Sequence, residues 1–134
     1  MKEVRRQVMR STVALALLAG AAISVVAVQA LHAQSKPPVY VVTENEIADL
    51  DAYSKEYVPL TQASIRAAGG RLVAAGQNVV SLEGALPGTR VAINEFDSLE
   101  AVQAWRASAQ YKDARKIGDK YAKFRSFAIE GLPK

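Results

Sequence analysis

Six side chains in this sequence have the chemistry needed to hold or transform a small molecule. They are the carboxylate of Glu83, the guanidinium of Arg71, the carboxamide of Asn94 and the polar aromatic rings of Tyr53, Trp105 and Tyr111. Arg71 follows the pair Gly69-Gly70 and is the strongest anion-binding candidate, because its planar fork matches a carboxylate. An internal ion pair between Arg71 and Glu83 or Glu95 is the alternative.

Glu83 and Asn94 are the candidates for proton transfer and for orienting a ligand. Glu83 lies between Leu82 and Gly84, and burial there would make its carboxylate a stronger general base. An exposed acid at the end of a strand is the alternative. Asn94 alternates with Ala92 along an otherwise apolar strand, so it could orient a ligand carbonyl or pair across a dimer.

The aromatic candidates have both a structural and a functional interpretation. Trp105 lies on an apolar stripe, which favours core packing, but a buried indole N–H needs a partner and could line a pocket. Tyr53, Tyr57 and Tyr111 could place their phenols in a cleft between sheet and helices. The alternative is that these rings pack and keep their hydroxyls at the rim.

Several kinds of site are excluded by missing residues. The chain has no Cys, and its single His is His32, near the N-terminus. Thiol catalysis and thiolate metal sites are therefore excluded, and a domain without His lacks the commonest general base and zinc ligand. Neither a phosphate-binding glycine loop nor a calcium loop is present. We therefore predict neither a cofactor nor a metal.

The N-terminal segment has the three parts of a secretory signal. Residues 1–10 are basic and residues 11–28 form a charge-free apolar run. Val28-Gln29-Ala30 fits a small-residue cleavage site, and Leu31-His32-Ala33 is a looser second choice. We predict a signal peptide over residues 1–33 and a periplasmic or secreted product. An uncleaved helix that anchors the protein to the membrane is the alternative.

The charge of the chain belongs mostly to this segment. Residues 1–33 carry four of the 17 Lys and Arg side chains but one of the 13 Asp and Glu, so the rest has a net charge of +1. A nearly neutral domain has little to attract a polyanion. We therefore predict that the mature domain binds neither nucleic acid nor a membrane.

Hydrophobic patterning predicts a β-α-β-β-α-β order. After a polar linker over residues 34–38, the domain spans residues 39–132. Strands are expected at 39–43, 71–75, 90–96 and 124–130, and helices at 47–68 and from Asp97 onward. Residues 79–84 either extend the second strand or form a hairpin arm.

Details of the two helices are also predicted. In the first, Leu50, Tyr53, Tyr57, Leu60 and Ser64 form one face, and Pro59 should kink or unwind it. In the second, Asp97 and Glu100 form a capping box, and Leu99, Val102 and Trp105 form the buried stripe. The triplet Ser108-Ala109-Gln110 should interrupt this second helix.

This order of elements predicts an α+β, ferredoxin-like fold. Two β-α-β halves give a four-stranded antiparallel sheet with both helices on one face. The other face of the sheet is then uncovered, which is unfavourable for a monomer of this size. A homodimer that packs sheet against sheet is the simplest solution.

The stretch FDSLEAVQAWRASAQY, residues 96–111, carries a family resemblance. The chain resembles the domain of unknown function family 1330, whose pattern falls here on Ser98, Glu100, Ala101, Trp105, Ser108 and Tyr111. The resemblance extends over about residues 38–132. It implies a ferredoxin-like, dimeric α+β barrel and implies no established activity.

Three functions are compatible with these observations. The first is an exported small-molecule-binding or accessory domain. The second is a cofactor-independent monooxygenase, isomerase or cyclase for a small aromatic or lactone-like substrate, which rests on analogy between folds. The third is a purely oligomeric, structural role. Whether the domain is an enzyme is therefore open at this point.

Overall fold

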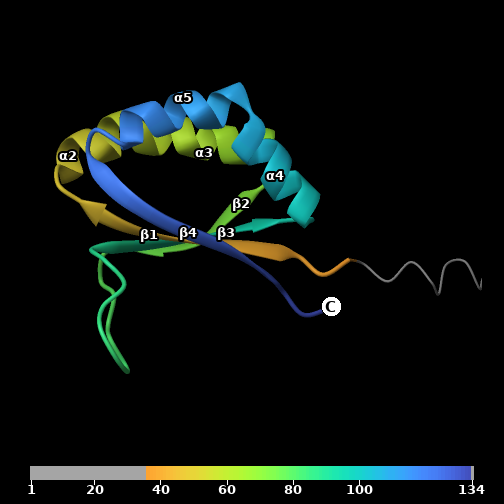
Figure 1. Ribbon diagram of the computed structural model, residues 1–134, viewed down its shortest axis with the longest axis horizontal. Helices are drawn as coiled ribbons and strands as arrows, with labels where there is room; N and C mark the ends of the chain where they lie inside the picture. The colour runs from red at the N-terminus through yellow and green to blue at the C-terminus, as the bar shows by residue number, and fades with distance from the viewer. Residues whose placement is uncertain (1–35, 134) are drawn as a thin grey trace, which may run out of the picture. The chain divides into compact units, whose positions relative to one another are not determined.

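The computed structural model describes residues 36–133, which form one layer of sheet and one layer of helices (Figure 1). The predicted signal segment, residues 1–33, lies outside the described residues. Within residues 36–133, no helix has the length and apolar character needed to cross a bilayer.

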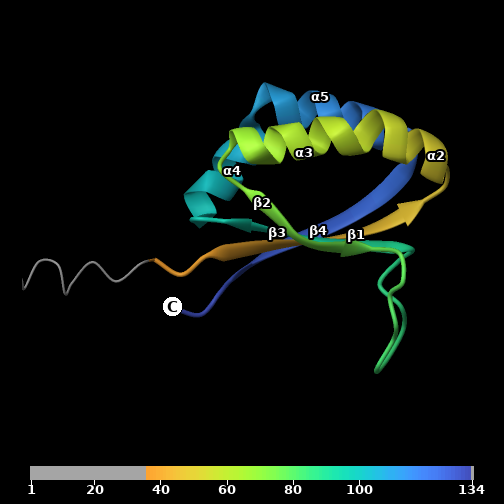
Figure 2. The same cartoon turned by 180° about the vertical axis from the view of Figure 1, so that it is seen from behind.

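The sheet has four antiparallel strands and confirms the predicted fold class. The strands are β1 (Val39–Ile47), β2 (Arg71–Gly76), β3 (Arg90–Phe96) and β4 (Ala122–Glu130). Their order in the sheet is β2-β3-β1-β4, so the two edge strands come from different β-α-β halves. This is the ferredoxin-like arrangement, and all helices lie on one face of the sheet (Figures 1 and 2).

Strand β1 is longer than its hydrophobic run predicts. It continues past Thr43 to Ile47, because it pairs with β4 as far as Ile47↔Ala122 and with β3 as far as Asn45↔Arg90. Hydrogen bonds to two neighbours override the weak strand preference of the sequence Glu44-Asn45-Glu46. The prediction that the first strand ends at Thr43 is therefore wrong.

The first helical segment is continuous in the chain but changes geometry. It consists of α2 (Leu50–Ala52), the π-helical turn η1 (Tyr53–Tyr57) and α3 (Val58–Ala67). Pro59 is in the first turn of α3, directly after η1. A proline has no amide hydrogen to donate, so the wider turn before it is the local unwinding that the sequence predicts.

The second helical segment is interrupted, as predicted, at Ser108. Helix α4 (Leu99–Ala107) ends there and α5 (Ala109–Gly118) begins, with the Ser108 hydroxyl accepting from the Tyr111 amide. The predicted Asp97 cap is wrong by one residue. The Ser98 hydroxyl accepts from the Ala101 amide and is the N-cap of α4.

The segment of residues 77–89 between β2 and β3 is a loop. The strand or hairpin arm predicted at residues 79–84 is therefore not formed. The loop projects from the sheet on the side away from the helices (Figures 1 and 2). Its apolar side chains face solvent in this chain, with Val80 77% and Leu82 95% exposed.

The core between sheet and helices has two centres. One contains Val39, Val41, Ile65, Phe96, Val102 and Trp105. The other contains Tyr53, Tyr57, Ala114 and Ala122. The predicted helix faces are only partly buried, because Leu50, Leu60 and Leu99 are each almost half exposed.

Gly118 is expected to be irreplaceable at the second centre. A Cβ atom there would lie 2.7 Å from Tyr57 Cδ2 and 3.0 Å from Phe124 Cζ. Overpacking of this kind costs about 1–3 kcal/mol, so Gly118→Ala should lower the free energy of unfolding in urea titrations. Gly76→Ala is the matched control, since the nearest atom to its Cβ would be 4.0 Å away. Equal stability of the two variants would contradict this packing.

Candidate functional site

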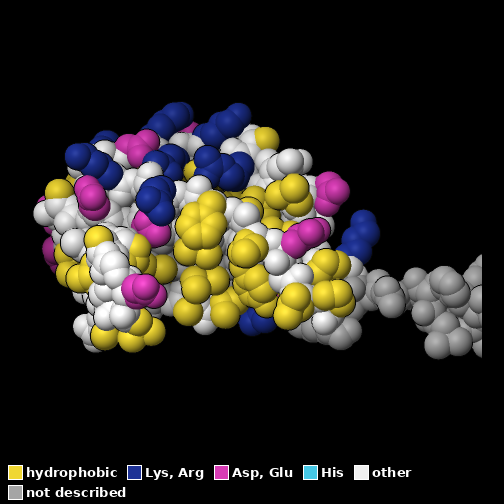
Figure 3. Space-filling view, turned by 60° about the horizontal axis from the view of Figure 1, so that its bottom comes forward, with side chains coloured by type: hydrophobic (Ala, Val, Ile, Leu, Met, Phe, Trp, Pro, Cys, Tyr) yellow, Lys and Arg dark blue, Asp and Glu magenta, His cyan; other side chains and the backbone are white. Residues whose placement is uncertain are grey.

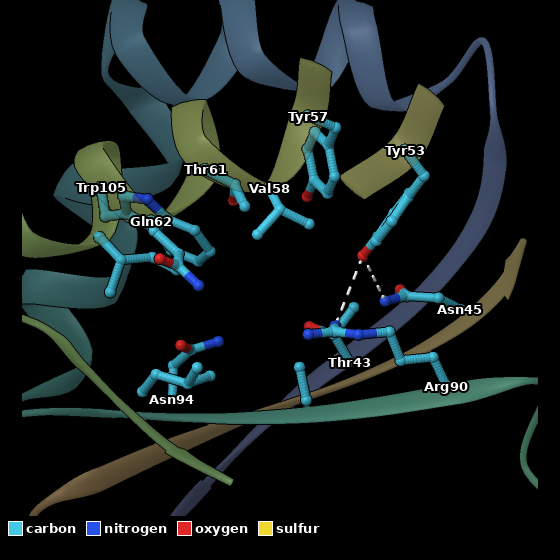
Figure 4. Close-up of a pocket in the computed structure, with 13 residues that line it drawn as sticks. Thr43, Asn45, Tyr53, Tyr57, Val58, Thr61, Gln62, Arg90, Asn94 and Trp105 are labelled. Carbon is cyan, nitrogen blue, oxygen red and sulfur yellow. Dashed lines mark hydrogen bonds between the residues drawn. The ribbon is translucent and has the colours of Figure 1, made fainter. Parts of the chain in front are cut away.

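A small cavity lies between the sheet and the first helical segment, where the two core centres meet. Its volume is about 50 Å³. The floor comes from β1 and β3, the roof from η1 and α3, and one end from Trp105 of α4 (Figure 4). Its polar lining consists of Thr43, Asn45, Tyr53, Tyr57, Thr61, Gln62, Arg90 and Asn94.

The space exists because small residues form the floor and the roof is held at a distance. Ala92 faces the helices at the centre of β3, and its cross-strand partner on β1 is Thr43. Both side chains are short. The π-helical turn presents Tyr53 and Tyr57 to the same cavity, since residues four apart in such a wide turn stay on one face.

One end of the cavity is a cluster of three polar side chains. Asn45 Nδ2 donates to the Tyr53 hydroxyl oxygen at 3.0 Å, and Arg90 Nη1 donates to the same oxygen at 3.5 Å. The Arg90 guanidinium also lies 5.8 Å from the centre of the Tyr53 ring. A cation and a phenol are thus brought together at the junction of β1, β3 and η1 (Figure 4).

The end of the loop before β3 holds this cluster in place. The Thr89 hydroxyl accepts from the Ile47 amide at 3.0 Å and donates to the Asn45 carbonyl oxygen at 3.1 Å. Gly88 has a φ of +91°, and a Cβ there would lie 2.9 Å from the Asn45 carbonyl oxygen. Only glycine permits this close approach, which fixes Asn45 beside Arg90.

Two residues that line the cavity have carboxamide oxygens without a hydrogen-bond partner among the described residues. These atoms are Asn45 Oδ1 and Asn94 Oδ1, and the two residues are 1% and 5% exposed. Nearly all buried polar side-chain atoms in proteins have a partner, because an unpaired one costs about 1–3 kcal/mol. These oxygens are therefore positioned to accept hydrogen bonds from something in the cavity.

Trp105 closes the opposite end with an apolar ring. Its Nε1–H donates to Ser64 Oγ at 3.0 Å, and Ser64 Oγ donates to the Thr61 carbonyl oxygen at 2.7 Å. This is the partner that a buried indole requires. Because the N–H is occupied, Trp105 offers the cavity only its ring surface.

Burial shifts the titration of both cavity phenols. It raises the pKa of Tyr57 to about 12 and also raises the pKa of Tyr53, where the nearby Arg90 partly offsets it. Both hydroxyls are therefore protonated at neutral pH and act as hydrogen-bonding groups. Neither is a phenolate nucleophile in the free protein.

The raised pKa of Tyr57 predicts a loss of stability at alkaline pH. The ordinary pKa is 10.0, so between pH 10 and pH 12 the folded chain keeps a proton that the unfolded chain has released. The free energy of unfolding then falls as pH rises, by about 1.3 kcal/mol between pH 9 and pH 11 from this group. Urea titrations should show this decline in the wild type and a correspondingly smaller one in Tyr57→Phe. An equal decline in both would contradict the shift.

The structure brings three of the six sequence candidates to this cavity. Tyr53, Asn94 and Trp105 line it. Tyr111 packs edge-on against Trp105, with ring centres 4.7 Å apart, and supports the wall from behind. The alternative of core packing thus describes Tyr111.

The two charged candidates lie elsewhere. Arg71 pairs with Glu95 at 2.8 Å, the internal ion pair expected as its alternative. Because Glu95 follows Asn94 in β3, this ion pair is on the sheet face opposite the cavity. Glu83 is exposed in the loop and lacks the burial that its role as a base required.

Asn45 and Arg90 are site residues that were not predicted. Neither lies in a motif: Asn45 falls between the first predicted strand and helix, and Arg90 is the first residue of the third predicted strand. Their common signal is the register, since Asn45 and Arg90 are directly opposite each other on β1 and β3. That pairing becomes visible only when β1 is extended beyond Thr43.

Other features of the surface are less suited to binding. An open hollow of about 540 Å³ lies between the loop residues Ala85–Gly88 and the ends of β1 and β4. Of the two residues with a buried, unpartnered oxygen, only Asn45 borders this hollow, whereas both line the small cavity. Within residues 36–133, no group of three or more His, Cys, Asp or Glu side chains could hold a metal ion.

Comparisons with known proteins define the relationships of the chain. The model of the family "Domain of unknown function (DUF1330)" matches residues 38–132. None of the curated proteins matches the sequence.

Solved structures of similar fold include RPA0582, a protein of unknown function from Rhodopseudomonas palustris. It is 20% identical with a TM-score of 0.57, over 81% of this chain and 93% of that chain. SnoaB, a cofactor-independent oxygenase from Streptomyces nogalater, is 11% identical with a TM-score of 0.56, over 73% and 96%. HapK from Hahella chejuensis is 15% identical with a TM-score of 0.55, over 72% and 94%. At these identities the likeness concerns the fold alone.

Proposed function

This chain belongs to the DUF1330 family of domains of unknown function, and within that family we propose that it binds a small molecule in the cavity beneath α3. The family carries no assigned activity, so the support comes from the cavity itself. The observation that carries the proposal is the pair of buried, unpartnered oxygens of Asn45 and Asn94. A bound molecule that donates hydrogen bonds would remove the cost of leaving them unpaired.

The size of the cavity limits what it holds. Its volume of about 50 Å³ is far below the range of about 300–1,000 Å³ typical of sites for drug-sized ligands. A buried water needs about 10–15 Å³, so the space is large enough for more than one such group. A compact molecule of a few carbon atoms fits better than a fused aromatic system.

Filling the cavity should abolish binding without unfolding the protein. Ala92→Leu adds three carbon atoms to the floor, mostly into existing space, so we expect the free energy of unfolding to fall by no more than about 1–3 kcal/mol. Ala104→Leu, on the exposed side of α4, is the matched control. In a thermal-shift screen of a metabolite library, hits should stabilise the wild type and Ala104→Leu but leave Ala92→Leu unshifted.

Two outcomes of this screen would count against the proposal. If Ala92→Leu responds to every hit as the wild type does, the ligands bind elsewhere. If no compound of the library gives a shift that is lost in Ala92→Leu, ordered water alone donates hydrogen bonds to the two oxygens, and the cavity is structural.

The second candidate is an enzyme that uses this cavity without a cofactor. It is supported by the protonated Tyr53 hydroxyl beside the Arg90 guanidinium, because this pair could deliver a proton to, and stabilise charge on, a substrate oxygen. The fold it shares with the cofactor-independent oxygenase SnoaB is compatible with such a role. Incubation of the hits with protein and mass spectrometry of the products distinguishes the two functions. Conversion that is lost in Tyr53→Phe, with binding retained, would favour the enzyme.

We also propose a homodimer built on the open face of the sheet. Phe127 and Ile129 of β4 are 47% and 57% exposed there, beside their cross-strand partners Val42 and Tyr40. Figure 3 shows hydrophobic side chains gathered on this part of the molecule. A second copy would cover an apolar surface that is costly to leave in water.

Two features suit this face to pairing with itself. Two ion pairs on this face are formed within the chain, Arg71 with Glu95 and Arg125 with Glu44, so these four side chains bring no uncompensated charge to an interface. The loop of residues 77–89 projects on the same side (Figure 1). With its exposed Val80 and Leu82, this loop would lie against the second copy.

We propose in addition that the domain acts outside the cytoplasm. The support is the basic, apolar and small-residue pattern of residues 1–33. Expression of the full chain in a Gram-negative host, followed by cell fractionation and intact-mass measurement, tests it. A periplasmic product shortened by about 30 residues is expected, whereas a full-length membrane-bound product would favour the anchor.

A further inference from the structure

The two ends of the cavity present opposite hydrogen-bonding demands. Arg90 and Asn94 lie on the same face of β3, with Ala92 between them. Four residues of a strand span about 13 Å between Cα atoms. Figure 4 shows the guanidinium of Arg90 below the Tyr53 hydroxyl and the carboxamide of Asn94 at the other end.

The Arg90 end offers donors. The Tyr53 oxygen already accepts from Asn45 Nδ2 and from Arg90 Nη1, so both of its lone pairs are used and only its O–H is left to bond. Among residues 36–133, Arg90 has no carboxylate within 4.0 Å. A guanidinium and a phenol O–H side by side are suited to an anionic oxygen, above all a carboxylate.

The carboxamides offer acceptors. Asn45 is bonded to Tyr53 at the donor end, and Asn94 lies at the end near Trp105 (Figure 4); the carboxamide oxygens of both are unpartnered. A carboxylate cannot satisfy either oxygen, because it has no proton to donate. The missing partners must be hydroxyl or N–H groups of the same molecule, one next to the anionic group and one farther along.

We infer that the ligand of this cavity is a short hydroxylated carboxylate, that is, a small sugar acid. This inference rests on the proposed binding function and adds its chemical class. The carboxylate binds Arg90 and Tyr53, a neighbouring hydroxyl donates to Asn45 Oδ1, and a more distant hydroxyl donates to Asn94 Oδ1. Glycerate, with three carbons, one carboxylate and two hydroxyls, is the smallest molecule with all three groups.

A panel of relatives of glycerate tests each contact separately. Lactate lacks the distant hydroxyl, 3-hydroxypropanoate lacks the near one, propanoate lacks both and glycerol lacks the carboxylate. Isothermal titration should give glycerate the highest affinity. Loss of one hydroxyl should weaken binding about 3–10-fold, and loss of the carboxylate about 10–100-fold.

Two variants should reproduce these losses from the side of the protein. Arg90→Met should lower the affinity for glycerate about 10–100-fold and leave the affinity for glycerol unchanged. Asn94→Leu should lower the affinity for glycerate to that for lactate and leave the affinity for lactate unchanged. Such pairing of variant with ligand group is not produced by a general loss of fold, which would weaken every compound alike.

Defined results would overturn the inference. Glycerol binding as tightly as glycerate, or Arg90→Met weakening both equally, would contradict the carboxylate site, and so would no binding of glycerate at all. Failure of the proposed function is distinguishable. In that case no library compound gives a thermal shift that is lost in Ala92→Leu. If this inference alone fails, such compounds are found but hydroxylated carboxylates are not among them.

Discussion

Replacing Trp105 by Ala is expected to lower the free energy of unfolding by about 3–5 kcal/mol, a large share of the about 5–15 kcal/mol typical of a small domain. The side chain is 5% exposed, and its ring centre lies 5.2 Å from that of Phe96 and 4.7 Å from that of Tyr111. Removal leaves a void between three elements and leaves Ser64 Oγ without its donor. Urea titration followed by circular dichroism measures the loss.

Trp105→Phe separates packing from hydrogen bonding. It keeps an aromatic ring against Phe96 but removes the N–H that donates to Ser64, so a smaller loss of about 1–2 kcal/mol is expected. If the two variants are equally unstable, the hydrogen bond dominates and the packing account is wrong. A loss below about 1 kcal/mol in Trp105→Ala would place the ring outside the core.

Phe127→Asp is expected to convert a dimer to a monomer. An unpaired carboxylate buried between two sheets costs about 3–5 kcal/mol, which corresponds to more than about 100-fold in the dissociation constant. Leu60→Asp is the matched control, because Leu60 is also 47% exposed but lies on the helical layer. Analytical ultracentrifugation should show dimers for the wild type and Leu60→Asp and monomers for Phe127→Asp.

The reverse pattern would refute this interface. A wild type that is monomeric at all accessible concentrations would show that the open face of the sheet tolerates water. Dimers that survive Phe127→Asp but not Leu60→Asp would place the interface on the helical layer. Either result also removes the role proposed for the loop of residues 77–89.

Most of the fold could be predicted because its signals are local. The alternation in residues 90–96 and the glycine pair at residues 69–70 fix where elements begin and end, and the structure places β3 and the end of α3 there. Ser108 ends one helix and caps the next, as its position between two apolar stripes indicates. Such patterns depend on neighbours in sequence, and these remain neighbours in the fold.

The candidate site was predicted less completely because its residues violate those patterns. Asn45 occupies a core-facing position of β1, but it lies between Glu44 and Glu46 after the apolar run, so the sequence predicts that the strand ends before it. Its partner Arg90 is identified only by the register of β1 and β3. A polar residue that interrupts a strand pattern is thus a better indicator of this site than the glycine-flanked Arg71 and Glu83.

The proposed function requires that a ligand bind in the cavity beneath α3, and nuclear magnetic resonance tests this most directly. The side-chain amide signals of Asn45 and Asn94 report on the two carboxamides whose oxygens lack partners. On titration with the strongest hit of the library screen, both signals should shift and saturate together with the thermal stabilisation, and neither should shift in Ala92→Leu. Saturable binding that leaves both signals unmoved in the wild type would contradict the account.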